Sequence, residues 1–452
     1  MVHDLLAEAA DRATRYLAGL GDRPVGVDAA AIRELDRLDE PFPDGPTDAG
    51  AVLAMLDEIG SPATTATASG RFFGFVIGGT LPVALAANWL AGAWDQNAAL
   101  TVTSPIAAKV EDVALGWLTD IFGLPGGTGA AFVTGATMAN FTALAAARHR
   151  VLADAGWDVE ADGLFGAPPI NVVVSDESHV SVFKALTMIG FGRERVIRVP
   201  VDSRGRLRPE SLPDLDGPTI LCAQAGNINT GAIDPIAGIC AWARGNGAWV
   251  HVDGAFGMWA AASPARAHLV AGITEADSWT IDTHKWLNVP YDSGVALVRD
   301  AESLRAAMSV SASYLTTGDA REPSHYVPEI SRRSRGVDVW AALRSLGRDG
   351  LADLIERCCR HASRFADGLR AAGYEILNDV ELNQVLVRFG DDETTRRVVA
   401  GIQADGTCWC GGTAWHGLAA MRISVSSWAT TDDDVERSLA AMLRIAREVV
   451  GH

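Results

Sequence analysis

The sequence predicts an α/β protein: a large domain built on a mostly parallel sheet, preceded by a helical arm and followed by a smaller α+β domain. Three observations lead to this prediction. Short apolar runs rich in Val and Ile alternate with helical patterns through the middle of the chain, as in parallel sheets that helices cover on both faces. The first 70 residues carry helical patterns but no apolar core of their own. Beyond Arg335, helices and strand-like runs follow in a different order.

Residues 1–70 are predicted to form the helical arm. Its two helical patterns run from Leu5 to Leu17 and from Asp48 to Ile59, and a connector rich in Pro, Gly and Asp leads into the second. The arm is amphipathic, so we expect it to pack either on the main domain or on a second subunit.

Residues 71–335 are predicted to form the large domain. It opens with the aromatic and glycine-rich loop Arg71–Gly79. The predicted elements that follow are two helices at 82–96 and 105–122 and seven strands at 130–134, 171–175, 196–200, 219–223, 248–252, 278–281 and 294–298. Sheets of this kind bind ligands beyond the carboxyl ends of their strands. The polar residues at such ends are Thr134, Ser175, Asp253 and Asp282.

Residues 336–452 are predicted to form the small α+β domain. Its predicted elements are helices at 337–346, 351–372, 393–404 and 432–449 and strands at 374–377, 384–389 and 421–426.

Composition excludes several classes of function. The 38 basic and 56 acidic residues give a net charge of −18, so we expect neither nucleic acid nor an anionic membrane as a partner. The start of the chain lacks the pattern of a signal peptide, and the longest apolar run, 80–94, is too short for a bilayer span. The six cysteines form no CxxC motif. We expect a cytoplasmic protein with reduced thiols and no metal site.

The stretch from Trp249 to Tyr291 carries the strongest chemical signal. Its first apolar run ends on Asp253, and its second leads to Lys285. Lone ionisable groups delivered by apolar strands are costly unless they have partners. Lysine occurs at only two other positions, Lys109 and Lys184, both in helical patterns typical of solvated side chains. Lys285 is therefore the candidate for a Schiff base with a carbonyl cofactor, although a structural ion pair with Asp282 is an alternative.

Two further turns are candidates for the same site. Gly135, Ala136 and Thr137 follow a strand and precede a helix, a position that suits an anion such as phosphate but also an ordinary helix start. His179 begins another helix, where it acts either in the site or as a simple capping neighbour.

The order of these motifs, ending in His284-Lys285-Trp286, resembles the group II amino-acid decarboxylases, which act on aromatic amino acids, glutamate or histidine. The resemblance covers nearly the whole chain, from Phe72 to the final helix. It implies fold type I of the pyridoxal phosphate enzymes, the aspartate aminotransferase-like transferase fold, with a mixed, mostly parallel seven-stranded sheet. It also implies pyridoxal 5′-phosphate as cofactor and conversion of an L-amino acid to an amine and CO₂.

The resemblance implies a role for each matching residue. Lys285 would hold the cofactor covalently, Asp253 would pair with its ring nitrogen, and His179 and Ala255 would pack on opposite ring faces. Tyr314 matches a tyrosine that protonates the substrate carbon in similar enzymes. The remaining cofactor contacts implied are Gly135, Ala136, Thr137, Asn227, Asn229, Asp282 and His284.

The chain departs from the family pattern at several positions. Asp282 stands where many relatives have asparagine, and Trp428 stands where aromatic decarboxylases have arginine, leaving Arg422 as a candidate partner for a carboxylate. The segments that match the side-chain pocket carry Val76, Ile77, Asn97 and Ala98. They favour an aromatic or branched apolar amino acid as substrate.

Two alternatives stay open at this point. An aminotransferase or an oxygen-dependent aldehyde synthase would use the same cofactor, and aldehyde synthases tend to lack the tyrosine or histidine that Tyr314 and His179 supply here. The resemblance further implies a homodimer with active sites at the subunit interface.

Overall fold

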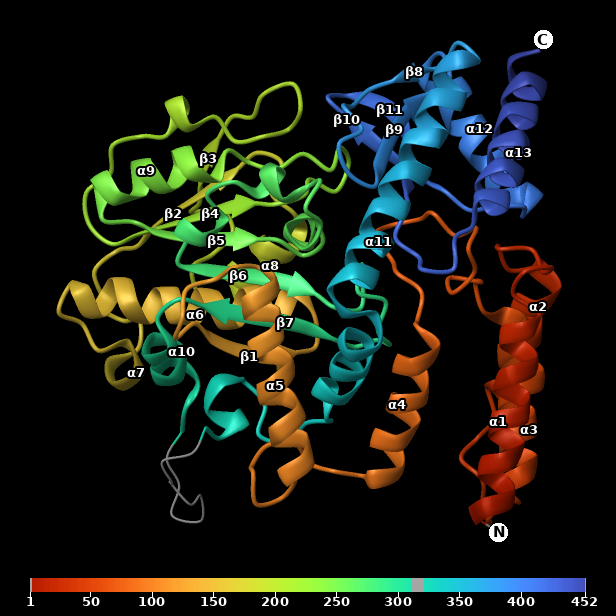
Figure 1. The fold of residues 1–452 in the computed structure, drawn as a ribbon, viewed down its shortest axis with the longest axis horizontal. Coiled ribbons are helices and arrows are strands. Elements are labelled where there is room, and N and C mark those ends of the chain that lie inside the picture. Colours follow the sequence, from red (N-terminus) through yellow and green to blue (C-terminus); the bar gives the residue numbers. More distant parts are fainter. Residues whose placement is uncertain (1, 311–320, 452) are drawn as a thin grey trace.

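The structure, a computed structural model, describes residues 2–310 and 321–451. Figure 1 shows a helical arm along one side, a large sheet domain on the other and a small domain near the carboxyl end. The arm contains α1 (Val2–Ala18), α2 (Ala29–Glu34) and α3 (Ala49–Gly60). An ion pair of 2.9 Å between Arg12 and Asp57 joins α1 to α3. No side chain of α1 is buried, in line with an arm that lacks its own core.

The large sheet has seven strands in the order β1-β7-β6-β5-β4-β2-β3. β7 pairs antiparallel with both β1 and β6, and the other pairs are parallel. The strands are β1 (Gly129–Val133), β2 (Asn171–Ser175), β3 (Ile197–Val199), β4 (Thr219–Gln224), β5 (Trp249–Asp253), β6 (Ser278–Asp282) and β7 (Gly294–Val298). The predicted mixed seven-stranded sheet is confirmed.

Alternation along the strands sends side chains to two separate cores. Val172 and Val174 of β2 pack in one cluster, whereas Val173 between them packs in another. Two helices, α6 (Ala136–Asp154) and α8 (Val180–Met188), supply the first cluster, and α5 (Pro105–Ile121) and α9 (Ile236–Asn246) contribute to the second. The sheet is thus covered on both faces, as continuous apolar strands require.

Three further α-helices lie among the described residues of this part of the chain, and the last two of them pack against α6. They are α4 (Pro82–Trp94), α7 (Val159–Asp162) and α10 (Ala301–Met308). Helix α6 begins at Ala136, directly after Gly135, which adopts φ 145° and ends the turn.

A second sheet forms the core of the small domain, in the antiparallel order β10-β11-β9-β8. Its strands are β8 (Glu375–Ile376), β9 (Gln384–Arg388), β10 (Gly411–Trp415) and β11 (Leu418–Ser424). Its helices are α11 (Arg335–Ala371), α12 (Asp392–Asp405) and α13 (Asp432–Val450). Gly347, at φ 61°, kinks α11 where the sequence predicts two separate helices.

Within residues 2–310 and 321–451, no helix is both long enough and apolar enough to cross a membrane. All six cysteines are buried and free.

Candidate active site

The carboxyl edge of the large sheet brings the predicted polar residues together. Asp253 at the end of β5 lies opposite Gln224 of β4 and Thr280 of β6 in the strand register. Asp282 ends β6, and the turn after β1 leads into α6 at the same edge. Parallel strands deliver their carboxyl ends to one side of a sheet. Motifs that are separate in the sequence therefore lie close together at this edge.

The carboxylate of Asp253 is buried and accepts three hydrogen bonds. One oxygen accepts from Nδ2 of Asn140 at 3.1 Å and from the hydroxyl of Ser181 at 3.4 Å, and the other accepts from the N–H of Ala255 at 3.2 Å. Among the described residues, no cationic side chain forms an ion pair with it. A buried carboxylate without such a partner fits a cationic ring nitrogen.

His179 sits at the start of α8, where both sequence interpretations apply. Its Nδ1 accepts the N–H of Ser181 at 3.3 Å and lies 2.8 Å from the hydroxyl of that serine. The imidazole therefore caps the helix, and it also lies in the site. Burial lowers the pKa of His179, and the charges of Asp253 and Lys285 act on it as well. With Nδ1 accepting, the neutral form of the ring carries its proton on Nε2.

The amine of Lys285 lies 3.0 Å from Oδ2 of Asp282. The predicted alternative of an ion pair at this position is thus present in the structure. The turn that carries the lysine is rigid, because Trp286 and Leu287 on its carboxyl side are fully buried. The aromatic loop 71–79 packs closely against this turn. A Cβ on Gly78 would stand only 1.8 Å from the carbonyl oxygen of Lys285.

The start of α6 is the turn that the sequence predicts to hold an anion. Helix α6 has no side-chain cap, and the N–H of Ala136 donates instead to Oδ1 of Asp282 at 2.6 Å. A Cβ on Gly135 would stand 2.9 Å from the His284 ring, so only glycine allows this close approach. His284 lies 3.6 Å from the same Asp282 oxygen, and burial lowers its pKa. Thr137 follows on the first turn of α6.

The loop after β4 carries the two predicted asparagines. Asn227 accepts the N–H groups of Asn229 and Thr230, and its own Nδ2 is buried without a hydrogen-bond partner. Asn229 accepts from the hydroxyl of Thr413 on β10. Asn229 therefore ties this loop to the small domain, while the unpartnered Nδ2 of Asn227 is a donor available to a ligand.

The segments predicted to line the pocket for the substrate side chain carry either apolar residues or a polar residue whose hydrogen bonds are made within the protein. Val76 is part of the large core, and Ile77 packs beside Phe72 and Trp409. Asn97 is held by its own loop, because its side-chain oxygen accepts the N–H groups of Ala99 and Arg332. Ala98 is buried beside it.

Arg422 on β11 is a buried cation and the candidate partner for the carboxylate of a substrate. Its guanidinium donates to the carbonyl of Ile228 at 3.3 Å, and its Nε has no partner. Burial lowers its pKa to about 10, so it stays charged at neutral pH. Its charge also acts on His179, which places it beside the site. No carboxylate pairs with it among the residues that the structure describes.

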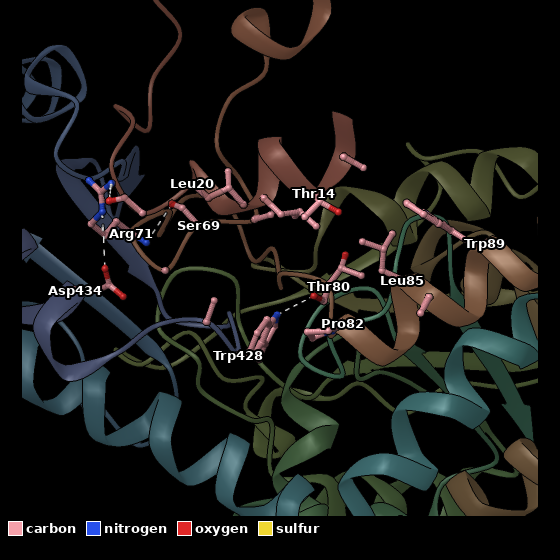
Figure 2. A pocket seen from close by; sticks show the side chains of 17 residues that line it. Thr14, Leu20, Ser69, Arg71, Thr80, Pro82, Leu85, Trp89, Trp428 and Asp434 are labelled. Carbon is pink, nitrogen blue, oxygen red and sulfur yellow. Dashed lines mark hydrogen bonds and ion pairs between the residues drawn. The ribbon is translucent and has the colours of Figure 1, made fainter. Parts of the chain in front are cut away.

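Trp428 lies outside this group, at the edge of a cavity of about 670 Å³ between the arm and α4. Figure 2 shows its indole donating to the carbonyl of Thr80, at 2.8 Å. Its role there is to join the small domain to the segment before α4. Tyr314 lies outside the described residues.

Three polar residues of the site are missing from the sequence interpretation: Asn140, Ser181 and His251. Asn140 and Ser181 hold Asp253, and Nε2 of His251 lies 2.8 Å from the side-chain oxygen of Asn140. Asn140 lies within a helical pattern far from Asp253 in sequence. Only the packing of α6 on β5 reveals its contact.

These residues fit pyridoxal phosphate. They supply an amine, a buried carboxylate without an ion pair, an imidazole and a helix start without a side-chain cap of its own. Asp282 is the exception, because its carboxylate occupies the donor that a phosphate group would use.

Comparison with known proteins agrees with this fit. The family described as "Pyridoxal-dependent decarboxylase conserved domain" matches residues 33–390. The chain is 25% identical to an aromatic-L-amino-acid decarboxylase of Bacillus atrophaeus, over 98% of this chain and 95% of that protein. It is 29% identical to an L-2,4-diaminobutyrate decarboxylase of Rhizobium meliloti (strain 1021), over 99% and 92%.

Among solved structures, Oryza sativa TDC with PLP and tryptamine aligns with a TM-score of 0.92 and 24% identity, over 99% of this chain and 98% of that one. The expected fold type I is confirmed. The chain belongs to the pyridoxal-dependent decarboxylase family and is a carboxy-lyase that uses pyridoxal phosphate to decarboxylate an amino acid.

Proposed function

We propose that the substrate is an L-amino acid with an apolar side chain, aromatic or branched. The observation that carries this proposal is the apolar character of the loops expected to border the side chain, at Val76, Ile77 and Ala98. A charged side chain would need an opposite charge that is not already paired.

The cations beside these loops are already engaged. Arg71 is buried and donates to the carbonyls of Gly21, Arg23 and Thr407. Arg332 pairs with Glu111 and also donates to carbonyls of the large domain. Neither is available for the carboxylate of an acidic side chain, which disfavours glutamate-like substrates.

Each residue of the site has a proposed task. Lys285 attaches the cofactor, whose ring, once bound, accepts the electron pair left when CO₂ departs. Asp253 keeps the ring nitrogen charged. His179 covers one ring face and excludes water, with its Nε2 proton available for donation. Arg422 binds the substrate carboxylate through a charge-assisted hydrogen bond and orients the bond to be broken.

Tyr314 is proposed to return a proton to the substrate carbon after CO₂ leaves, on the strength of its match to decarboxylase tyrosines. Amine is then the product, and neither aldehyde with peroxide nor a keto acid.

We further propose that the protein is a homodimer. The arm and α4 expose apolar side chains that a monomer leaves in water; they include Leu6, Leu17, Val52, Leu56, Trp89, Leu90 and Trp94. The cavity of Figure 2 lies between these two elements. An apolar surface of this kind is typical of subunit interfaces. Light scattering at several protein concentrations tests this, and a monomer at all concentrations would contradict it.

The function is tested by incubating the purified protein and pyridoxal phosphate with each common L-amino acid. CO₂, amine, ammonia and hydrogen peroxide are measured in the same sample. We expect stoichiometric CO₂ and amine with tryptophan, tyrosine, phenylalanine or leucine as substrate. Keto acid, or peroxide without amine, would assign the chain to a different reaction. Turnover of glutamate or diaminobutyrate alone would overturn the proposed substrate class.

A further inference from the structure

We propose that Asn140, His251, Ser278 and Trp249 form a one-way chain of hydrogen bonds that holds the carboxylate of Asp253 in place and aims it at the cofactor. None of these four residues is expected to touch substrate or cofactor. They are positioning residues that act through Asp253, and the inference rests on the role proposed for Asp253 above.

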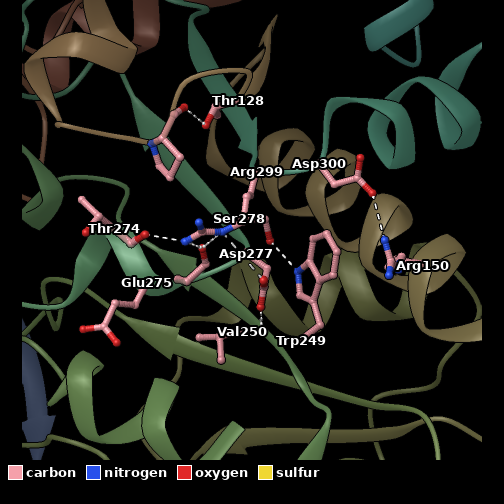
Figure 3. A network of polar contacts seen from close by, with 12 residues as sticks. Thr128, Arg150, Trp249, Val250, Thr274, Glu275, Asp277, Ser278, Arg299 and Asp300 are labelled. Atoms are coloured by element: carbon pink, nitrogen blue, oxygen red, sulfur yellow. Dashed lines mark hydrogen bonds and ion pairs between the residues drawn. The ribbon is translucent and has the colours of Figure 1, made fainter. Parts of the chain in front are cut away.

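The chain is continuous and buried. Nε1 of Trp249 donates to the hydroxyl of Ser278 at 2.8 Å, and Nδ1 of His251 lies 2.9 Å from the same hydroxyl. Nε2 of His251 lies 2.8 Å from Oδ1 of Asn140, whose Nδ2 donates to Asp253 at 3.1 Å. Figure 3 shows the first link, with the indole of Trp249 pointing at Ser278.

The direction of these bonds is fixed at the outer end. An indole N–H can only donate, so Ser278 accepts from Trp249. The serine proton then has one acceptor within reach, Nδ1 of His251. A bond in which Nδ1 donates would leave this serine proton without an acceptor, so the outer end favours the form with the histidine proton on Nε2, facing the oxygen of Asn140.

The direction is fixed independently at the inner end. An ionised carboxylate can only accept, so Asn140 must present its NH₂ group to Asp253. Its oxygen then faces His251, which must donate from Nε2. The opposite arrangement would set the amide oxygen against the carboxylate at 3.1 Å. Both ends impose the same tautomer on His251.

Neutrality of His251 supports this arrangement. Burial lowers its pKa to about 4, so the ring carries one proton at neutral pH and can donate at one nitrogen only. Every dipole of the chain then points its positive end toward Asp253. Aligned hydrogen bonds polarise one another and strengthen the last bond, the one to the charge. The chain thus directs its last donor, the NH₂ group of Asn140, at the carboxylate that would pair with the ring nitrogen of the cofactor.

The tautomer of His251 is the first test, and it needs neither cofactor nor substrate. Long-range ¹⁵N–¹H correlation spectra of ¹⁵N-histidine-labelled protein distinguish the Nε2–H form from the Nδ1–H form and from the imidazolium. His251→Gln identifies its signals by their loss. We expect the Nε2–H form alone between pH 6 and 8. The Nδ1–H form, or a cationic ring, would overturn the proposal.

The second test breaks the chain far from the cofactor. Ser278→Ala removes the second link, and Thr280→Val is a matched control. Thr280 is also buried on β6 and stands next to Asp253 in the register, but its hydroxyl has no hydrogen-bond partner. We expect Ser278→Ala to raise the dissociation constant of pyridoxal phosphate about threefold and to lower kcat by a similar factor with KM unchanged. Thr280→Val should change neither.

Equal effects of the two variants on cofactor affinity and kcat would show that these effects come from packing, and would overturn the proposed chain of hydrogen bonds. Failure of the proposed function is a separate outcome: wild-type protein that binds the cofactor but releases no CO₂ would refute the substrate and leave the result for His251 intact.

Discussion

Nζ of Lys285 lies 3.0 Å from Oδ2 of Asp282, and Oδ1 of the same carboxylate accepts the N–H of Ala136 at 2.6 Å. One side chain thus bridges the amine proposed to attach the cofactor and the helix start that would hold its phosphate. A carboxylate at this point repels a phosphate group and competes with it for the same donor.

Asp282→Asn should therefore tighten cofactor binding. Removing one negative charge within a few ångströms of the phosphate should lower the dissociation constant of pyridoxal phosphate about tenfold, which corresponds to about 1.4 kcal/mol. Fluorescence titration of the cofactor-free protein measures the constant. Asp277→Asn is the control, because it removes the same charge at the start of β6, where Asp277 accepts the N–H of Val250. Weaker binding in Asp282→Asn would mean that the carboxylate supports the cofactor.

A second prediction concerns Arg422. Arg422→Met should lower kcat/KM about 100-fold, because a charge-assisted bond to the substrate carboxylate is lost, while the affinity for the cofactor stays the same. The same change should raise the free energy of unfolding by about 1 kcal/mol, since a buried guanidinium with an unpartnered Nε disappears.

Steady-state kinetics and urea unfolding check both parts of this prediction. Arg388→Met on neighbouring β9 is the control, because Arg388 already pairs with Asp392 at 2.9 Å. It should leave kcat/KM unchanged. A stability loss in Arg422→Met together with normal kinetics would assign Arg422 a structural role.

The sequence predicts the large sheet well because its strands are continuous apolar runs. The bounds of all seven predicted strands agree with those in the structure to within one or two residues. Strands that are buried on both faces carry apolar residues at successive positions, which makes them easy to recognise. Strand β10 was missed, because Gly411 and Gly412 give it no β-propensity and it forms only as the partner of β11.

Some residues of the candidate site can likewise be predicted from the sequence, and others cannot. Asp253 at the end of β5 and Lys285 in the turn after β6 stand out because a lone charge interrupts an apolar pattern. Asn140 and His251 could not be predicted, since their contact depends on the packing of helix α6 against β5. The ion pair between Lys285 and Asp282 is the alternative that the sequence leaves open, and it is present in the structure.

The third prediction is a pH dependence of stability. Folded His251 has a pKa of about 4, below the usual value of about 6.5 in an unfolded chain. Between these values the unfolded state binds the extra proton, so stability falls as pH falls. Because of this histidine, the free energy of unfolding should fall by about 2 kcal/mol between pH 7 and pH 5.

Urea unfolding of wild type and His251→Gln at both pH values isolates the effect. Burial raises the pKa of Asp234 and of Asp338 to about 6, and these acids stabilise the protein in the opposite direction as pH falls. Both proteins share them, so they cancel in the difference. A difference between the two proteins that does not change with pH would contradict a buried neutral His251.

The fourth prediction concerns the ion cluster under the loop that carries Asn97. Glu111 of α5 is buried and pairs with Arg332 and, at 3.4 Å, with Arg321. Glu111→Gln should lower the free energy of unfolding by about 3–5 kcal/mol, because it leaves the buried Arg332 guanidinium without a counter-charge. Asp120→Asn on the same helix is the control: it breaks an exposed pair with Arg348 and should cost less than about 1 kcal/mol. Urea unfolding measures both, and equal losses would mean that burial does not strengthen the Glu111 pair.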